Sequence, residues 1–374
     1  MNKKTAIWII VAIVVIGGIW FYQTKTGSQT ATQNTEGKIL KIGAILPLSG
    51  PIASAGGFAK NGIEEALADI AEDKNLNIEV IFEDGQYDAK TSVSAYNKLK
   101  TVDGVDALIV FGTPSVMSIA PLVNADRIPL LGLLAAPNYS SPDDFTFRMM
   151  GHSDTEAKFA SDILVDKLGK KKIAVMYLNN DYGTGALASF KKYVAGRATV
   201  VAEEGSAPGT TDYRAQLTKI KNTAPDAIFL ATLYKEGGLI VKQAKEMGIA
   251  GPFMCGQPCD VPELITTAGA ASEGLIVVAP TDKNGTGFID EYQKIYGARP
   301  SYLALRTYDA TNILNSIAPN CASSNFSGDC LKKQIDDLNG FPGLSYPINF
   351  DNNGDINDQF VVKVIKNGKY EAYE

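Results

Sequence analysis

The chain has 374 residues, a hydrophobic fraction of 45% and a formal net charge of −6 at pH 7. This length exceeds one ordinary domain and suits two lobes, and the hydrophobic fraction is sufficient for two buried cores. The negative charge excludes a surface made for nucleic acid or anionic lipid, because such a surface requires clustered Lys and Arg.

The N-terminal segment is an uncharged apolar run over residues 6–22, preceded by two lysines. Its roughly 17 residues reach the lower limit for spanning a bilayer. A cleaved signal peptide ends in small residues and a lipoprotein signal ends at a Cys, whereas this run ends in aromatic residues and the first Cys is Cys255. We therefore expect residues 1–22 to form an uncleaved signal anchor, one transmembrane helix. A cleaved signal peptide is the alternative.

Residues 23–38 consist largely of Thr, Gln, Ser, Gly and Asn. Such a composition cannot bury a core and predicts a flexible tether. The anchor and tether together place the remaining chain on the extracytoplasmic side of a cell membrane.

Strand-like runs then alternate with amphipathic helices. The expected strands are 42–46, 77–83, 107–111 and 129–133, and the expected helices are 57–71, 91–100 and 114–125. This alternation is typical of βαβ units around a parallel sheet. The turn at residues 47–51 follows the first strand, where such sheets bind ligands.

A second, similar series begins after residue 150. Its expected strands are 172–178, 198–203, 227–231, 252–255 and 274–279, and its expected helices are 155–168, 185–195, 213–222 and 237–247. After these come a helix at 302–316 and a hairpin between 346–350 and 359–365. The repetition predicts an α/β protein with two doubly wound parallel-sheet lobes joined by crossover hinges. We assign 39–150 and 281–342 to lobe 1, and 151–280 and 343–374 to lobe 2.

The four cysteines form two local pairs, Cys255 with Cys259 and Cys321 with Cys330. In an exported protein these pairs predict two short-range disulfides. Zinc is the alternative, but neither spacing fits a common zinc motif. The only histidine, His152, is interpreted as a loop or lobe-junction residue, so no metal site is expected.

Thr113 and Pro114 follow the strand at 107–111 and open a helix. With Thr113 as the N-cap, the N–H groups of Ser115 and Val116 should point out of the helix start. This helix start and the Thr113 and Ser115 hydroxyls form a candidate carboxylate site. Simple helix capping is the alternative.

Two further motifs imitate known sites. Residues 183–188 match the G-x-G-x-x-A dinucleotide fingerprint, with Glu203 about 20 residues further on. Four residues separate the preceding strand from Gly183, so we expect no nucleotide cofactor. Asp351, Asn353 and Asp355 imitate a calcium loop, but the glycine and the twelfth residue do not fit that pattern, which indicates a turn.

A series of short motifs runs along the chain in a fixed order: Ile42-Gly43, Leu48-Ser49-Gly50, Asp84, Ile119-Ala120-Pro121, Arg127-Ile128-Pro129, Asp181-Tyr182-Gly183, Phe253-Met254, Glu273-Gly274 and Tyr308-Asp309-Ala310. This series resembles the leucine/isoleucine/valine-binding protein family, the type I periplasmic solute receptors of ABC importers. The resemblance extends from residue 38 to the C-terminus. It implies a receptor without catalytic activity or cofactor, whose partners are a small ligand, an ABC permease and its ATPase.

The resemblance also implies site residues. By position, Thr113 matches the hydroxyl residue that binds a ligand carboxylate, and the Ala135 carbonyl matches the group that faces the ligand ammonium. Tyr182 and Tyr234 match the tyrosines that line the cleft.

Three positions depart from the family pattern. Ala136 stands where Thr is usual, Gln257 stands near the Glu that pairs with the ammonium, and Ala55 replaces an aromatic residue. The loss of a carboxylate partner weakens binding of an ammonium unless Asp260 or Glu236 substitutes. We therefore expect a ligand that carries a carboxylate or an amide, bound by Thr113, Ser115, Ala135, Ala136, Tyr182, Tyr234 and Gln257. A ligand-sensing ectodomain and a nucleotide-dependent enzyme are the alternative functions.

Overall fold

The computed structural model describes residues 38–72, 77–136, 139–282, 285–356 and 358–373. The predicted anchor at 1–22 lies outside these residues, as does the tether apart from Lys38. Within the described ranges, no helix is long and apolar enough to cross a membrane.

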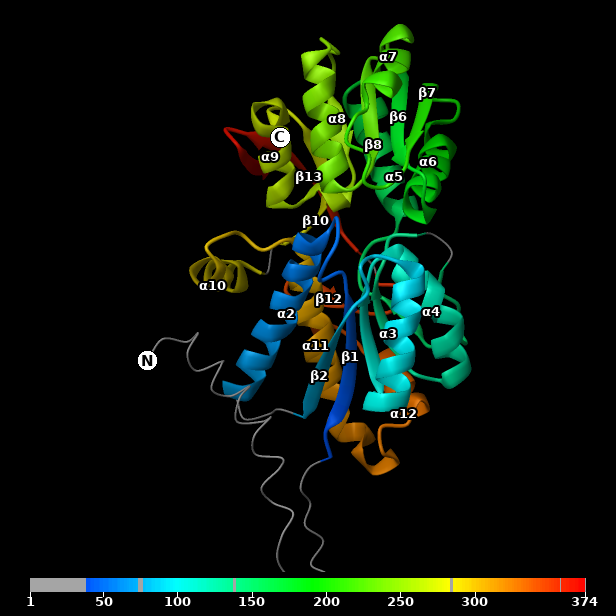
Figure 1. The fold of residues 1–374 in the computed structure, drawn as a ribbon, viewed down its shortest axis with the longest axis vertical. Helices are drawn as coiled ribbons and strands as arrows, with labels where there is room; N and C mark the ends of the chain where they lie inside the picture. Colours follow the sequence, from blue (N-terminus) through cyan, green and yellow to red (C-terminus); the bar gives the residue numbers. More distant parts are fainter. Residues whose placement is uncertain (1–37, 73–76, 137–138, 283–284, 357, 374) are drawn as a thin grey trace, which may run out of the picture. The chain divides into compact units, whose positions relative to one another are not determined.

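The first sheet is parallel and has the strand order β2-β1-β3-β4-β5. Its strands are β1 (Leu40–Leu46), β2 (Ile78–Asp84), β3 (Ala107–Phe111), β4 (Leu130–Leu133) and β5 (Thr146–Arg148). All five residues of β3 are buried, because helices cover both faces of the sheet. This sheet and its helices are called the first lobe (Figure 1). The helices are α2 (Ala53–Glu72), α3 (Ala89–Lys98), α4 (Thr113–Asp126), α11 (Tyr302–Cys321) and α12 (Gly328–Asp336).

Helix α11 belongs to the first lobe although it lies far along the chain from the other elements there. It packs closely against α2, where the Thr307 hydroxyl donates to the Ala59 carbonyl at 2.7 Å. A Cβ at Gly62 would collide with the Ala304 carbonyl, so only glycine permits this approach of the two helices.

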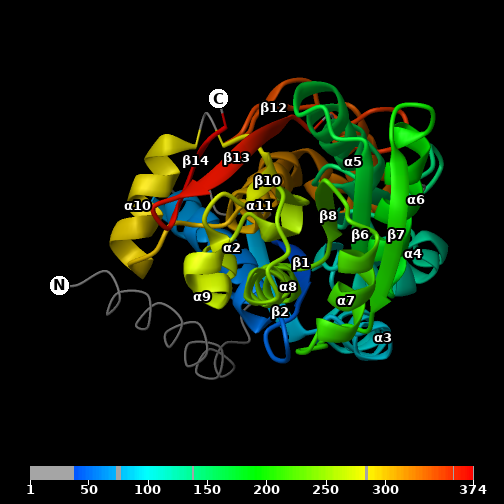
Figure 2. The same ribbon diagram turned by 90° about the horizontal axis from the view of Figure 1, so that it is seen from above.

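The second sheet has the order β14-β13-β10-β9-β8-β6-β7. Its strands are β6 (Lys172–Leu178), β7 (Thr199–Ser206), β8 (Ala227–Ala231), β9 (Phe253–Cys255), β10 (Ile276–Pro280), β13 (Phe360–Lys366) and β14 (Lys369–Ala372). Strands β6 to β10 are parallel, and β13 and β14 add antiparallel strands at the β10 edge (Figure 2). With its helices this sheet forms the second lobe. The helices are α5 (Ser153–Ser161), α6 (Asp181–Val194), α7 (Arg214–Asn222), α8 (Tyr234–Glu246) and α9 (Pro262–Ala268). The two largely parallel sheets confirm the predicted α/β fold.

The segments that cross between the sheets meet at the buried carboxylate of Asp358. Its Oδ2 accepts the Gly151 N–H at 2.6 Å. Its Oδ1 accepts from Arg306 Nη2 and from the Tyr346 hydroxyl, both at 2.7 Å. Gly151 follows β5 and Asp358 precedes β13, so this carboxylate joins two crossing segments to the start of α11.

The predicted hairpin between 346–350 and 359–365 is wrong. Strand β13 pairs with β10 and β14, while β12 (Pro347–Ile348) pairs with β11 (Phe341–Pro342). The intervening segment is held on the first sheet, because Arg148 forms an ion pair with Asp355 at 2.8 Å. Strand β13 instead lies between β10 and β14 in the second sheet.

Several short elements were not predicted from the sequence. They are β5, α9, α10 (Thr286–Tyr296), α12, which contains Cys330, β11 and β14. The structure joins Cys255 to Cys259 and Cys321 to Cys330 by disulfides.

Candidate functional site

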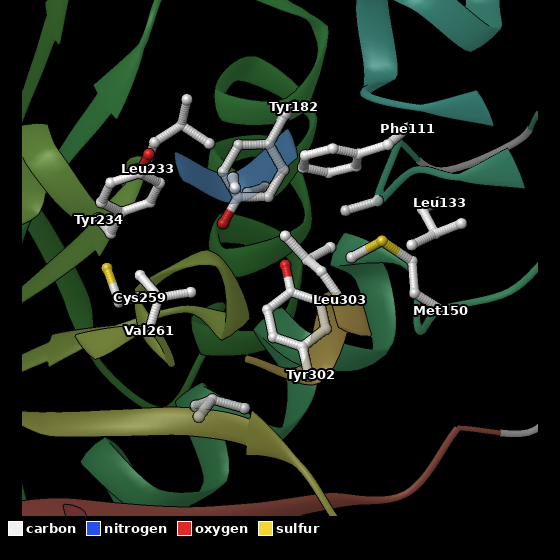
Figure 3. Close-up of a cluster of buried hydrophobic side chains, with 14 of the residues drawn as sticks. Phe111, Leu133, Met150, Tyr182, Leu233, Tyr234, Cys259, Val261, Tyr302 and Leu303 are labelled. Atoms are coloured by element: carbon white, nitrogen blue, oxygen red, sulfur yellow. The ribbon is translucent and has the colours of Figure 1, made fainter. Parts of the chain in front are cut away.

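A cavity of about 40 Å³ lies between the carboxyl ends of first-sheet strands and the loops of the second lobe. Figure 3 shows hydrophobic side chains that line it, among them Phe111, Tyr182 and Tyr302. The cavity is lined by Ile52, Ala55, Tyr87, Phe111, Gly112, Thr113, Leu133, Leu134, Ala135, Met150, Tyr182, Leu233, Tyr234, Pro258, Val261, Tyr302 and Leu303. This lining is aliphatic and aromatic, and it contains no charged side chain. Its polar groups are the Thr113 and tyrosine hydroxyls and the backbone at the start of α4.

The two lobes touch directly beside this cavity. The Ser54 hydroxyl on α2 and the Tyr234 hydroxyl on α8 are 2.7 Å apart and share a hydrogen bond. Since Ser54 belongs to the first lobe and Tyr234 to the second, this bond can exist only while the lobes are together.

The start of α4 differs from its prediction. Gly112, with φ of 115°, is the N-cap, and Thr113 is the first helical residue, so the predicted N-cap at Thr113 is wrong. The Val116 N–H donates to the Gly112 carbonyl at 2.9 Å. The open first-turn N–H groups are therefore those of Thr113 and Ser115. Glycine suits this N-cap position because a positive φ of this size disfavours any residue that has a side chain.

Four of the predicted ligand contacts, Thr113, Ala135, Tyr182 and Tyr234, line the cavity, and their contact with a ligand stays a prediction. The Ala135 carbonyl already accepts the Ser153 N–H at 2.7 Å, which leaves one lone pair for a ligand.

Three other expected site residues do not line the cavity. Ser115 Oγ is buried and has no hydrogen-bond partner among the described residues. The Ala136 carbonyl accepts from Arg148 Nη1 at 2.7 Å. Gln257 Nε2 donates to the Gly151 carbonyl at 2.7 Å. A contact between Gln257 and a ligand stays a prediction; Gln257 Oε1 has no hydrogen-bond partner among the described residues.

The two acids considered as substitutes for the missing carboxylate also lie away from the lining. Asp260 Oδ2 accepts from Lys363 Nζ at 2.9 Å. Glu236 Oε1 accepts the Gly209 N–H at 3.1 Å. Both acids are thus engaged within the second lobe.

A buried acid that the sequence analysis missed stands behind the lining. Glu156 on α5 is fully buried; its Oε1 accepts from the Tyr182 hydroxyl at 3.3 Å and its Oε2 accepts the Gln257 N–H at 3.0 Å. Burial raises the pKa of this carboxyl to about 7, against the opposing effect of these hydrogen bonds. Its position beside Ala157 and Ala160 on the buried face of α5 was the available signal, since an acid on an apolar stripe is unusual.

The other motifs have structural explanations. A Cβ at Gly183 would collide with the backbone of Leu178, so close packing of α6 on β6 requires this glycine, and Glu203 pairs with Lys191 at the surface. Asp351 accepts the N–H groups of Asn353 and Asp355, which closes the predicted turn.

His152 lies at the lobe junction. Its Nδ1 accepts the Asp154 N–H at 3.2 Å and caps α5, and the residue borders a second, polar cavity of about 540 Å³. Burial lowers the pKa of His152, which favours the neutral ring that capping requires.

Comparisons with known proteins agree with this architecture. Residues 39–369 match the periplasmic binding protein family. The leucine-, isoleucine-, valine-, threonine-, and alanine-binding protein of Pseudomonas aeruginosa is 25% identical over 289 residues, which cover 74% of this chain and 76% of the relative. Leu/Ile/Val-binding protein homolog 1 of Brucella suis is 26% identical over 324 residues, covering 84% and 86%. The crystal structure of the leucine-binding protein LivK from Thermotoga maritima superposes with a TM-score of 0.81 at 26% identity, covering 90% of this chain and 98% of that one.

Proposed function

Because this chain belongs to the periplasmic binding protein family, we propose that it captures one small organic solute between its lobes and passes it to the permease and ATPase of an ABC importer. The relatives named above are binding proteins, which supports a receptor without catalytic activity. A ligand-sensing ectodomain is the alternative, and genes for a permease and an ATPase beside this one would favour transport.

The proposed ligand is a carboxylate or amide with an apolar side group. The observation that carries this proposal is the start of α4, where the Thr113 and Ser115 N–H groups open beside a cavity without a charged side chain. A helix start favours an anion through its N–H groups and dipole. A ligand ammonium would instead lose hydration without gaining a carboxylate partner in the lining.

The size of the cavity bears on how a ligand enters. A volume of about 40 Å³ holds roughly three water molecules. A branched or aromatic solute needs more room, so binding requires the lobes to part and close again around it. The Ser54–Tyr234 hydrogen bond would break in the open form and return in the closed form.

Amino acids form the second candidate class, because the relatives are named for binding leucine, isoleucine and valine. Titration calorimetry on the full-length chain with 4-methylpentanoate and with leucine separates the two classes, since these ligands differ only in the α-ammonium. We expect 4-methylpentanoate to bind more tightly. Tighter binding of leucine would refute the preference for a carboxylate without ammonium.

We also propose that residues 1–22 anchor the mature protein in the cell membrane through the tether at 23–38, with the binding lobes outside the cytoplasm. Intact-mass analysis of membrane-extracted protein tests this, because a mature N-terminus between residues 22 and 38 would refute it. The lobe boundaries stay proposals. The ion pair of Asp355 with Arg148 favours placing the last boundary near Asp358 instead of residue 343.

A further inference from the structure

Glu156 is a buried acid without a cationic partner among the residues that the structure describes. Its hydrogen bonds come from the Gln257 N–H on Oε2 and the Tyr182 hydroxyl on Oε1. A Cβ at Gly256 would collide with Oε1, so glycine is needed there for the carboxyl to reach Tyr182. Gly256 thus leaves room for the Glu156 carboxyl, which lies directly behind Tyr182 in the lining of the cavity.

The two carboxyl oxygens are not equivalent. Oε2 faces a backbone N–H, which can only donate, so a proton on the carboxyl belongs on Oε1. When Glu156 is charged, the Tyr182 hydroxyl donates to Oε1 and turns its lone pairs toward other partners. When Glu156 is protonated, Oε1 donates to the Tyr182 oxygen, and the phenolic hydrogen is released to donate elsewhere.

We propose that Glu156 is a positioning residue that selects ligands through Tyr182: in its charged form the cavity favours a hydrogen-bond donor on the ligand, and in its protonated form it favours an acceptor. The inference rests on the proposed function, because it assumes that the ligand lies in the cavity that Tyr182 lines. It adds a second recognition point, apart from the start of α4 that holds the carboxylate.

Both forms of Glu156 occur at accessible pH, since burial raises its pKa to about 7. The titratable groups that face it are Tyr182 from α6 and Tyr302 from α11, and burial raises the pKa of both well above its ordinary value. Strand β10 presents only apolar residues to α5. The N-cap of the same helix, His152, is a further titratable group; burial lowers its pKa, and it requires a control.

The test uses three probes that differ only at the carbon next to the carboxylate: leucine has a donor there, 4-methyl-2-oxopentanoate an acceptor, and 4-methylpentanoate neither. Their dissociation constants for the full-length chain are measured by calorimetry from about pH 5.5 to 8.5, a range in which none of the probes changes charge. We expect the ratio of leucine affinity to oxo-acid affinity to fall about tenfold as the pH decreases, the effect of one hydrogen bond.

Glu156→Gln imitates the protonated form of Glu156 at every pH. The Gln257 N–H again selects the side-chain oxygen, so the amide nitrogen faces Tyr182 as a permanent donor. This variant should prefer the oxo acid by the same ratio at every pH. Tyr182→Phe should also lose the pH dependence, but at an intermediate ratio. His152→Asn keeps a good helix cap and should retain the wild-type pH dependence.

A ratio that is constant with pH in the wild type, or a pH dependence that persists in Glu156→Gln, would overturn the inference. If 4-methylpentanoate fails to bind at any pH, the proposed ligand class is refuted instead, and a ligand-free measurement decides on Glu156. For that, the ¹³C-tyrosine NMR signal of Tyr182, identified by its loss in Tyr182→Phe, should titrate near pH 7 in the wild type only. A Tyr182 signal without this Glu156-dependent titration overturns the inference.

Discussion

Replacement of Asp358 by Ala should destabilise the protein strongly, because this carboxylate neutralises a buried arginine. The side chains of Arg306 and Asp358 are each only 1% exposed. Arg306 Nε and Nη1 have no hydrogen-bond partner among the described residues, so the bond from Nη2 to Asp358 is the main compensation for its charge. Removal of one member of a buried ion pair typically costs about 3–5 kcal/mol.

The other contacts of Asp358 raise this expected loss. Asp358→Ala also leaves the Gly151 N–H and the Tyr346 hydroxyl without their acceptor. Each such buried group adds about 1–3 kcal/mol if no water replaces the carboxylate. We therefore expect a loss of about 5 kcal/mol or more, the sum of the smallest of these three values.

Urea unfolding followed by circular dichroism measures this loss as a shift of the midpoint. Asp337→Ala is the matched control, since its ion pair with Lys333 is exposed and should contribute less than about 1 kcal/mol. Arg306→Met combined with Asp358→Ala should recover part of the loss in stability, because neither charge of this ion pair is then present. A loss below about 1 kcal/mol for Asp358→Ala, equal to the control, would refute the assigned role of this carboxylate.

Three further predictions concern the ligand, the disulfides and pH. Thr113→Ala should weaken carboxylate binding by about 1–2 kcal/mol in calorimetry, because one hydrogen bond to a charged group is lost. The control variant Ser118→Ala, further along α4, should bind the carboxylate with wild-type affinity. Equal affinities of the two variants would count against the α4 site. Cys321→Ser should lower the free energy of unfolding by roughly 2–3 kcal/mol, and non-reducing peptide mapping that recovers free thiols would contradict the pairing. Burial raises the pKa of Asp309 to about 7 from 3.8, so the folded state binds a proton that the unfolded state has released, and stability should fall as pH rises from about 4 to 7. Asp309→Asn should reduce this fall by an amount on the order of 3 kcal/mol when urea midpoints are compared at about pH 5 and 8, and an unchanged fall would show that Asp309 stays ionised.

Most strands of the two parallel sheets and the family could be predicted from the residues alone. The predicted strands at 172–178 and 227–231 coincide with β6 and β8, because strands of a covered parallel sheet are continuous apolar runs that local composition reveals. The order of short motifs likewise identified the solute-receptor family that residues 39–369 match.

The pairing of β13 and the side chains that face the cavity could not be predicted from the sequence. Strand β13 pairs with β10, which lies about 80 residues earlier in the chain. It does not pair with the nearby segment 346–350, which the turn at 351–355 indicated as its partner. The Ser115 and Gln257 side chains do not line the cavity, whereas the Glu156 carboxyl lies behind its lining. A pattern of residue types fixes the period of an element, but the direction of each side chain depends on packing against residues distant in sequence. The Glu156 carboxyl reaches the Tyr182 hydroxyl and the Gln257 N–H only because the fold brings α5, α6 and the 256–260 loop together.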